Sequence, residues 1–224
     1  MKFSGLTLLG AALLATQSVS AHYIFKTLVA GGKTSTAAVR QPVDLMPYAG
    51  ITTPSSSARC NVNPGKASET VTVGAGDKVG FQLSNNMYHE GPVSIYLGQA
   101  PGSAAEWDGS GERWFKIAEW GAKTLNPLRF TGTGQTEFTT TIPVSVPNGE
   151  YLVRIEQVGM HLGTGVTEAF ISCGQIKVTG GGNGNPPKVA IPGHIHEGDH
   201  SVTVDIYNNN GAPYTCPGPA VWRG

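Results

Sequence analysis

The sequence predicts an all-β protein, an antiparallel β-sandwich with long loops. Composition gives the first indication, because 31 glycines and 15 prolines make up about a fifth of the 224 residues and only 13% of the residues are charged. That balance is typical of turn-rich β proteins. The second indication is periodicity. Short stretches of alternating apolar and polar residues recur between turn residues, and no segment has a sustained helical period.

Residues 1–21 have the pattern of a secretory signal peptide. A lysine follows the first methionine, an apolar run extends over Leu6–Ala15, and Val19-Ser20-Ala21 is a small-residue cleavage site. The apolar run is too short to span a bilayer. We therefore expect a secreted, extracellular protein whose mature chain begins at His22, with residues 22–224 forming one domain.

Turn residues separate the predicted strands, which favours a sandwich of the immunoglobulin-like or fibronectin-like kind. The first two strands flank a turn at Gly74–Asp77 and are expected to form a β-hairpin. Long loops are predicted over Gln41–Gly65 and Gly180–Pro187, with a last strand after the second loop returning to the sheet. The predicted strands are Glu69–Val73, Lys78–Leu83, Val93–Leu97, Trp114–Ala118, Glu137–Ile142, Tyr151–Glu156, Ala169–Ser172, Gln175–Val178 and Ser201–Ile206.

The charge pattern excludes some partners. The formal net charge is zero, and no block of basic residues occurs. Binding to nucleic acid or to an anionic membrane needs clustered positive charge, so neither partner is expected. We expect a monomer that acts on a neutral partner.

Three cysteines, Cys60, Cys173 and Cys216, are an odd number for a chain predicted to enter an oxidising compartment. One disulfide and one remaining cysteine is the simplest arrangement, and the residues alone do not select the pair. A bridge from Cys60 to Cys173 would close a long loop and could stabilise the fold by ~2 to 5 kcal/mol. Cys216 would then be a free thiol or a crosslink to another molecule.

Cleavage after Ala21 would turn His22 into a metal chelator. An N-terminal histidine offers a metal two nitrogens, the α-amine and the ring Nδ1. The α-amine titrates near pH ~8, so a metal can displace its proton at neutral pH. The alternative is a ring that stands free in solvent, since histidine is a common surface residue.

The other five histidines have functional and structural interpretations. His89 precedes a predicted strand, where a Gly-Pro turn could fix its ring at the sandwich edge; otherwise it is a hydrogen-bonded loop residue. His161 could donate a hydrogen bond near a site or be a satisfied surface residue. His194, His196 and His200 are expected to form a solvent-exposed cluster, in which the His-x-His spacing puts two rings on one side of an extended segment and can bind zinc or copper adventitiously. No ligand from a separate rigid element joins that cluster.

Short motifs follow one order along almost the whole mature chain. They are His22-Tyr23, Arg59-Cys60-Asn61, Tyr88-His89 with Gly91-Pro92, Trp114–Ile117, Gly149–Gln157, His161, Ser172-Cys173, Ile191–Gly193, Tyr214 and Pro217–Trp222. In these motifs the sequence resembles the fungal lytic polysaccharide monooxygenases of the cellulose-active type, a family formerly classed among the glycoside hydrolases. The resemblance implies a β-sandwich, one copper ion per chain, an external electron donor, and oxidative cleavage of glycosidic bonds with O2 or H2O2.

Carried over by position, the resemblance implies a copper site made of the amine and ring of His22 and the ring of His89. It also implies a disulfide between Cys60 and Cys173, and a place for His161 in the catalytic set. Three neutral nitrogen ligands leave positions open at copper, as oxidation of a C–H bond requires.

Two residues of the candidate catalytic set depart from the family pattern. Phe170 stands where an axial tyrosine is expected, so a weak oxygen ligand and a phenol are lost. Glu168 stands where the family usually has a glutamine that hydrogen-bonds the oxygen species. A carboxylate there either ionises and favours Cu(II) or stays protonated and donates. We expect both changes to affect rate, oxidant preference and selectivity more than copper binding.

The resemblance also implies the substrate, which we expect to be cellulose or a related β-1,4-glucan surface, oxidised at C1. Tyr23, Tyr88 and Tyr214 could stack on pyranose faces, and partial core packing is the alternative for each tyrosine.

Two rival functions come from other classes. A secreted copper-binding or carbohydrate-binding protein without efficient turnover would share the scaffold, and the residues at 168 and 170 keep that interpretation open. A hydrolase is a poor third interpretation. Glu90, Glu156 and Glu168 lack the context of an acid/base pair, whose carboxylates need a defined separation.

Overall fold

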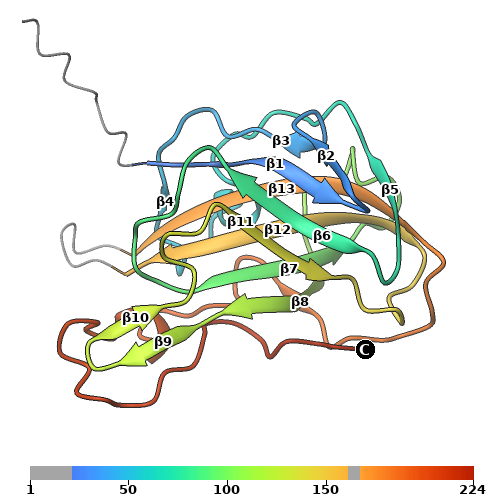
Figure 1. The fold of residues 1–224 in the computed structure, drawn as a ribbon. Helices are drawn as coiled ribbons and strands as arrows, with labels where there is room; N and C mark the ends of the chain where they lie inside the picture. The colour runs from blue at the N-terminus through green and yellow to red at the C-terminus, as the bar shows by residue number, and fades with distance from the viewer. Residues whose placement is uncertain (1–21, 161–166) are drawn as a thin grey trace, which may run out of the picture.

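Two β-sheets face each other across a buried core in the computed structural model, which describes residues 22–160 and 167–224 (Figure 1). The smaller sheet has the strand order β11-β6-β1-β2, and its pairs are antiparallel. Its strands are β1 (Phe25–Ala30), β2 (Lys33–Ser35), β6 (Lys78–Leu83) and β11 (Glu137–Thr141). The predicted all-β sandwich is confirmed.

The larger sheet has the order β14-β8-β7-β12-β13-β3, and β4 and β5 also pair with β13. Only the pair of β5 with β13 is parallel among the strand pairs of the described ranges. The strands are β3 (Val39–Arg40), β4 (Tyr48–Ala49), β5 (Val71–Gly74), β7 (Val93–Gln99), β8 (Glu112–Trp120), β12 (Gly149–Gly159), β13 (Glu168–Thr179) and β14 (Val189–Ala190).

Three smaller elements lie outside the two sheets. The strands β9 (Ala122–Leu125) and β10 (Leu128–Phe130) form a separate hairpin, and the helices α1 (Ser57–Cys60) and α2 (His200–Thr203) are one turn each. Neither helix is long and apolar enough to cross a membrane, and the same holds throughout the part of the chain that the structure describes.

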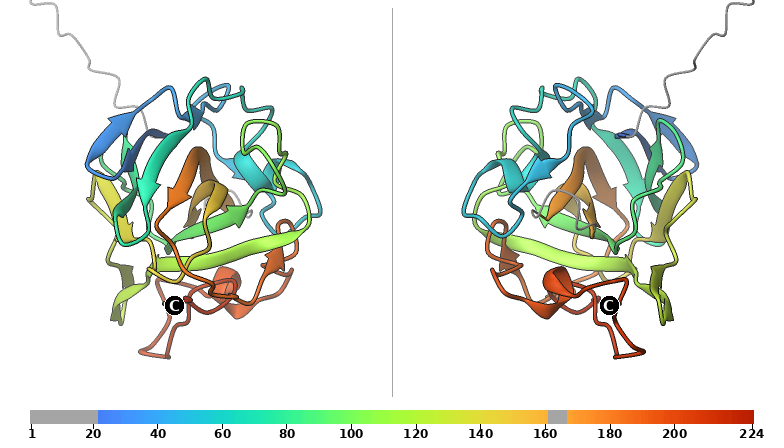
Figure 2. Two further views of the ribbon diagram at one scale, coloured as in Figure 1. Left: turned by 90° about the vertical axis from the view of Figure 1, so that its right-hand side faces the viewer. Right: turned by 90° about the vertical axis from the view of Figure 1, so that its left-hand side faces the viewer.

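β12 is buried on both faces because it lies in the middle of the larger sheet. Side chains alternate along it, so that Val153 and Ile155 face the core between the sheets while Leu152 faces outward. The outward face is covered by a second apolar cluster, to which α1, β10 and the C-terminal segment contribute. Figure 2 shows this C-terminal segment, in orange and red, against β8.

Three local predictions are wrong. The stretch Ser201–Ile206 begins within α2 and is not a strand. Its apolar residues Val202 and Ile206 are buried in the outer apolar cluster, so they need no partner strand to leave the solvent. β5 and β6 do not form a hairpin; they belong to different sheets. The two strands predicted over Ala169–Ser172 and Gln175–Val178 are one continuous strand, β13.

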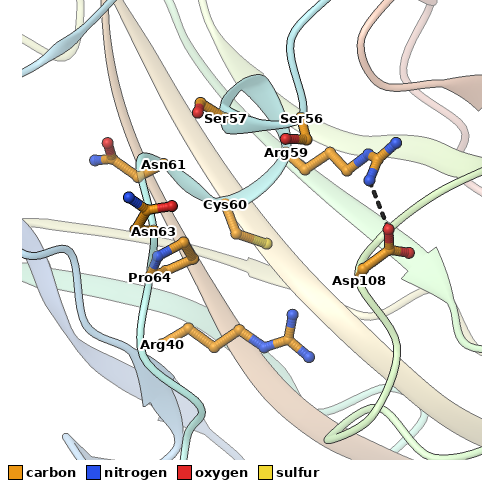
Figure 3. Close-up of a pocket in the computed structure, with 9 residues that line it drawn as sticks. All are labelled: Arg40, Ser56, Ser57, Arg59, Cys60, Asn61, Asn63, Pro64 and Asp108. Atoms are coloured by element: carbon orange, nitrogen blue, oxygen red, sulfur yellow. Dashed lines mark hydrogen bonds and ion pairs between the residues drawn. The ribbon is translucent and has the colours of Figure 1, made fainter.

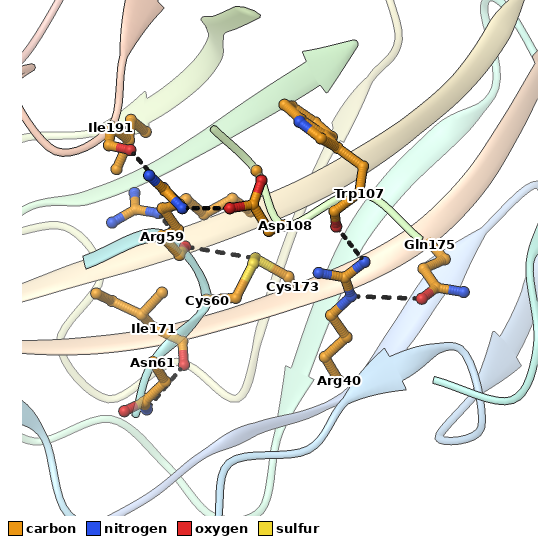
Figure 4. Close-up of a disulfide and its surroundings, with 12 residues drawn as sticks. Arg40, Arg59, Cys60, Asn61, Trp107, Asp108, Ile171, Cys173, Gln175 and Ile191 are labelled. Atoms are coloured by element: carbon orange, nitrogen blue, oxygen red, sulfur yellow. Dashed lines mark hydrogen bonds and ion pairs between the residues drawn. A yellow bond between two sulfur atoms is a disulfide. The ribbon is translucent and has the colours of Figure 1, made fainter. Parts of the chain in front are cut away.

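A disulfide joins Cys60 at the end of α1 to Cys173 in β13, across a sequence separation of 113 residues (Figure 4). Neighbouring polar contacts fasten the same segment to the sheet. Asn61 Nδ2 donates to the Ile171 carbonyl at 3.1 Å, and Arg59 Nε donates to the Ile191 carbonyl at 3.1 Å. The pairing expected from the family resemblance is therefore present.

Cys216 is a buried free cysteine. Burial raises the pKa of its thiol to about 11, and Glu119 acts in the same direction. A protonated, enclosed thiol is a poor partner for a crosslink, so of the two roles open to Cys216 the structure favours the free thiol.

Candidate metal site

His22 and His89 come from distant segments and lie at the same end of the sandwich. The backbone N–H of Ser84 donates to the Ile24 carbonyl at 3.0 Å, and the Ile24 N–H donates to Ser84 Oγ at 3.3 Å. Ser84 follows β6 and begins the segment that leads to His89, so these bonds hold the start of the described chain against that segment. The two imidazole ring centroids are 6.3 Å apart.

This separation fits one metal ion held between the two rings. A metal lies ~2.1 Å from a coordinating imidazole nitrogen, with the ring centroid roughly 1 Å beyond, so rings on opposite sides of one ion have centroids about 6 Å apart. Imidazole nitrogens are ligands that suit copper. Both histidines are half-buried, which leaves them accessible from outside.

Phe170 on β13 stacks on one of the two histidines and lies near the other. Its ring stacks on the His89 ring at a centroid distance of 5.2 Å and an angle of 20°, and its centroid lies 6.3 Å from that of His22. The Phe170 ring also stacks on the Tyr23 ring, at a centroid distance of 4.4 Å. A phenyl ring carries no donor atom, so Phe170 can orient the imidazoles by packing but cannot be a ligand.

Glu168 lies two residues before Phe170 on the same strand, opposite Gly159 of β12. Side chains two residues apart on a strand share a face, which places the carboxylate on the face of the site. Its charge reaches the Tyr23 phenol, whose pKa is raised far above its usual range mainly by burial and further by Tyr88 and Glu168. The half-buried carboxylate therefore lies at the edge of the site.

Gln157 of β12 joins the two halves of the site, and the sequence interpretation assigned it no role. Its Oε1 accepts a hydrogen bond from the Tyr23 hydroxyl at 2.9 Å. Its Nε2 donates to the carbonyls of His89 at 3.4 Å and Val158 at 3.0 Å. One feature of the sequence could have indicated this role: Gln157 is a glutamine at an inward-facing position of β12, whose other inward-facing residues are apolar.

The residues after His89 fix its backbone. The Glu90 carbonyl accepts a bond from the Met160 N–H at 2.8 Å, and Glu90 Oε2 accepts one from the Phe130 N–H at 2.9 Å. Gly91 has φ of +149° and passes so close to Val158 that a side chain would collide with its carbonyl. The Gly-Pro turn predicted to position His89 thus depends on the glycine.

The three tyrosines predicted to bind substrate occupy different environments. Tyr23 is fully buried, so its predicted stacking on a sugar is wrong; its ring packs on Phe170 instead. Tyr88 is half-buried and meets Tyr23 edge-to-face at 5.6 Å. Tyr214 is also half-buried, packs edge-to-face on Phe130 at 5.1 Å, and donates its hydroxyl hydrogen to a backbone carbonyl at 2.8 Å.

The C-terminal histidines do not form the predicted exposed cluster. His194 is buried and its Nε2 lies 3.0 Å from Glu156 Oε2, whereas the His196 side chain is 76% exposed. The described residues contain no group of three or more histidine, cysteine, aspartate or glutamate side chains arranged to hold a metal. His161 lies outside the described residues.

Glu156 belongs to a buried ion cluster on the outward face of the larger sheet. Arg154 Nη2 lies 2.5 Å from Glu156 Oε2, and both side chains are essentially inaccessible. Burial opposes the charge on Glu156, but Arg154 and then His194 outweigh it and hold the pKa of the carboxyl well below its usual range. An enclosed Glu156 that is paired with Arg154 and His194 cannot reach a substrate as a hydrolytic acid, which removes one carboxylate from the hydrolase interpretation.

A polar cleft of about 300 Å³ lies elsewhere, beside the disulfide (Figure 3). Arg59 Nη1 pairs with Asp108 at 2.7 Å on one side, and Arg40 Nη2 donates to the carbonyls of Ala104 and Trp107 at 2.6 and 2.7 Å on the other. Because the structure already occupies these guanidinium groups, the cleft is explained as part of the packing around α1.

Comparisons with known proteins identify the family of the chain. The family model described as Auxiliary Activity family 9 (formerly GH61) matches residues 22–214. The AA9 family lytic polysaccharide monooxygenase H of Malbranchea cinnamomea is 43% identical over 96% of this chain and 99% of that protein. The AA9 family lytic polysaccharide monooxygenase E of Podospora anserina is 44% identical over 97% of this chain and 74% of that protein.

Solved structures show the same architecture. A cellulose-active polysaccharide monooxygenase from M. thermophila superposes with a TM-score of 0.80 at 25% identity, over 91% of this chain and all of that one. HiLPMO9B superposes with a TM-score of 0.79 at 27% identity over the same shares.

The sandwich is that of the lytic polysaccharide monooxygenases, a class of copper-dependent enzymes that cleave polysaccharides oxidatively. The chain belongs to Auxiliary Activity family 9.

Proposed function

We propose that residues 22–224 form one secreted catalytic domain that oxidises β-1,4-glucan in cellulose at C1. In this proposal one copper ion is held by the amine and ring of His22 and by the ring of His89, after removal of residues 1–21. The observation that carries it is the 6.3 Å separation of the two rings above Phe170. Copper would supply activation of O2 or H2O2 with electrons from an external reductant.

The protein's own residues have distinct tasks in this proposal. Gln157 fixes the His89 backbone and Tyr23 at once, which preorganises the two ligand segments. Phe170 orients the His89 imidazole by stacking on it. Glu168 shares their face and can accept or hold a proton beside the reacting C–H bond.

Accessibility supports a polymeric substrate. His22, His89, Tyr88 and Glu168 are all half-buried, so the site opens at the surface of the sandwich end. A crystalline glucan cannot enter a deep pocket. It can lie across a shallow site at the surface, as this one is.

The histidine pair is tested by copper titration of the mature protein and its variants. His89→Ala should weaken Cu(II) binding by more than tenfold, because one of three nitrogens is lost. His196→Ala is the matched control, since that side chain is 76% exposed and is not one of the proposed ligands. Unchanged affinity in His89→Ala would remove His89 from the copper site.

The chemistry is tested by mass spectrometry of products from cellulose incubated with copper-loaded mature protein and ascorbate. Aldonic acids that depend on the reductant are expected. Predominant C4 oxidation would contradict the proposed regiochemistry. Glu168 and Phe170 favour one second candidate function, a copper-binding or carbohydrate-binding protein without efficient turnover. Copper binding with no oxidised product from cellulose, xyloglucan or xylan would support this second candidate.

A further inference from the structure

One turn contacts the segment that carries His89 on both sides of that residue. The turn, Phe130–Gln135, lies between β10 and β11, at the end of the molecule where β1 begins (Figure 1). Before His89, the Met87 N–H donates to the Gln135 carbonyl at 2.9 Å, and the Met87 carbonyl accepts the Gly134 N–H at 2.6 Å. These two backbone bonds fix the chain two residues ahead of the imidazole.

After His89, a side chain makes the connection to the same turn. Glu90 Oε2 accepts a hydrogen bond from the Phe130 N–H at 2.9 Å and a second from the Thr133 hydroxyl at 3.0 Å. A carboxylate oxygen forms stronger hydrogen bonds than a neutral oxygen does. One atom of Glu90 therefore ties the residue that follows His89 to two points of the turn.

The turn is itself held in one conformation. The Gln135 N–H donates to the Gly132 carbonyl at 3.1 Å, and Gln135 Nε2 donates to the Thr131 carbonyl at 2.7 Å. Gly132 is buried, and a Cβ added to it would lie 2.7 Å from Met87 Cε. The turn and the His89 segment are thus already in close contact, so a shift of the turn would be passed to the segment.

We propose that Glu90 is a positioning residue for His89, the copper ligand of the proposed function. Only Tyr88 and His89 lie between the anchors at Met87 and Glu90, so the direction of the imidazole depends on both anchors. A metal site requires its ligands within about half an ångström of the productive geometry. Glu90 meets that requirement through the backbone, by holding the chain directly after the ligand. This inference rests on the proposed function, because His89 is a copper ligand only there.

A second carboxylate makes the same kind of bond far from His89. Glu150 Oε2 accepts a hydrogen bond from the Ala104 N–H at 2.7 Å, and Glu150, like Glu90, is half-buried. Glu150 lies at the start of β12, whereas Gln157, which contacts the His89 carbonyl, lies near the end of that strand. A role in stability alone predicts the same result when either carboxylate is lost. A positioning role predicts that only Glu90 affects copper.

The test is Cu(II) titration and electron paramagnetic resonance of the Cu(II)-loaded mature protein and its variants. Glu90→Leu should weaken Cu(II) affinity roughly tenfold, the lower end of the effect expected for a contact behind a metal ligand, and should shift the copper hyperfine coupling. Glu90→Gln keeps an oxygen that can accept both bonds, so it should retain the affinity and the spectrum. Thr133→Val removes one bond and should cause a smaller change in the same direction. Glu150→Leu is the matched control and should match the wild type in both measurements.

The variants separate the explanations. Wild-type affinity and spectrum in Glu90→Leu overturn the positioning role, and so do changes of equal size in Glu150→Leu. A Glu90→Gln protein that behaves like Glu90→Leu overturns it too, because the charge and not the placed acceptor would then be responsible. If Glu90→Leu does not fold, Thr133→Val decides, and wild-type values in that variant overturn the role.

The wild type separates this inference from the proposed function. A wild type that binds copper through His89, together with a Glu90→Leu protein that behaves in the same way, refutes only the positioning role. A wild type that binds no copper refutes the proposed function and the positioning role together.

Discussion

The Tyr23 hydroxyl donates a 2.9 Å hydrogen bond to Gln157 Oε1, and both side chains are fully buried. The other end of the same amide holds the backbone of His89. The residue next to the proposed N-terminal ligand and the backbone of the second ligand therefore share one glutamine. Loss of that amide should loosen both ligand segments together.

Removal of both partners of this bond should destabilise the protein by less than the sum of the two single removals. Gln157→Leu leaves the Tyr23 hydroxyl without the acceptor for its hydrogen, and Tyr23→Phe leaves Gln157 Oε1 without its donor, at a cost of ~1 to 3 kcal/mol each. The double variant should lose less than the sum of the two. Urea unfolding of all four proteins measures the coupling, and strictly additive losses would contradict it.

Stability should fall on acidification because of the buried Glu156–His194 pair. Burial lowers the pKa of His194, and Glu156 offsets only part of that effect, while the pKa of Glu156 is also depressed in the fold. The unfolded chain therefore binds the extra protons, first below the ordinary histidine value of 6.5 and then below the ordinary glutamate value of 4.5.

Unfolding free energies at pH 7.5, 5.5 and 4 test this dependence. His194→Gln should flatten the fall between pH 7.5 and 5.5, because no buried imidazole then has to stay neutral. His196→Gln, an exposed histidine, is the control and should leave the wild-type slope. Identical slopes in the three proteins would show that His194 does not control the pH dependence.

The disulfide should contribute a large part of the stability. It closes a loop of 113 residues and anchors α1 to β13, so Cys60→Ala/Cys173→Ala should lose ~2 to 5 kcal/mol of unfolding free energy. Cys216→Ala removes a cysteine without opening the bridge and should lose clearly less. Comparable losses in the two variants would show that side-chain packing, not the crosslink, supplies the effect.

An uncleaved residue before His22 should abolish the proposed chelate. With Ala21 retained, the His22 nitrogen becomes an amide that cannot donate to copper at neutral pH, so Cu(II) affinity should fall at least ~10-fold and activity should fall with it. An alanine added after Gly224 is the control. Full affinity in the protein that retains Ala21 would exclude the amine as a ligand.

The central strands were predictable because period-two alternation and length define them locally. Lys78–Leu83 matches β6 at both ends, and Val93–Leu97 lies within β7. Pairing was not predictable in the same way. The turn at Gly74–Asp77 leads from one sheet to the other, and β5 joins β13 from about a hundred residues away. Short strands such as β4, with two residues, have no periodicity to detect.

The candidate site likewise has residues that the sequence predicted and residues that it did not. Motif order identified His22 and His89, which the fold brings together. The burial of Tyr23 and the bridging role of Gln157 depend on contacts across 134 residues of chain, which no local pattern encodes. Likewise, the spacing of His194 and His196 gave no sign that one ring would be enclosed by Glu156 while the other stays in solvent.

The enclosed thiol of Cys216 has a practical consequence for spectroscopy. Because burial raises the pKa of the Cys216 thiol to about 11, this thiol should react poorly with maleimides near neutral pH. The other two cysteines, Cys60 and Cys173, are joined in the disulfide. A cysteine introduced at the exposed position Val144 would then be the one labelled thiol. A single fluorophore could report where a molecule binds on a polysaccharide fibre without any mutation of the native cysteines.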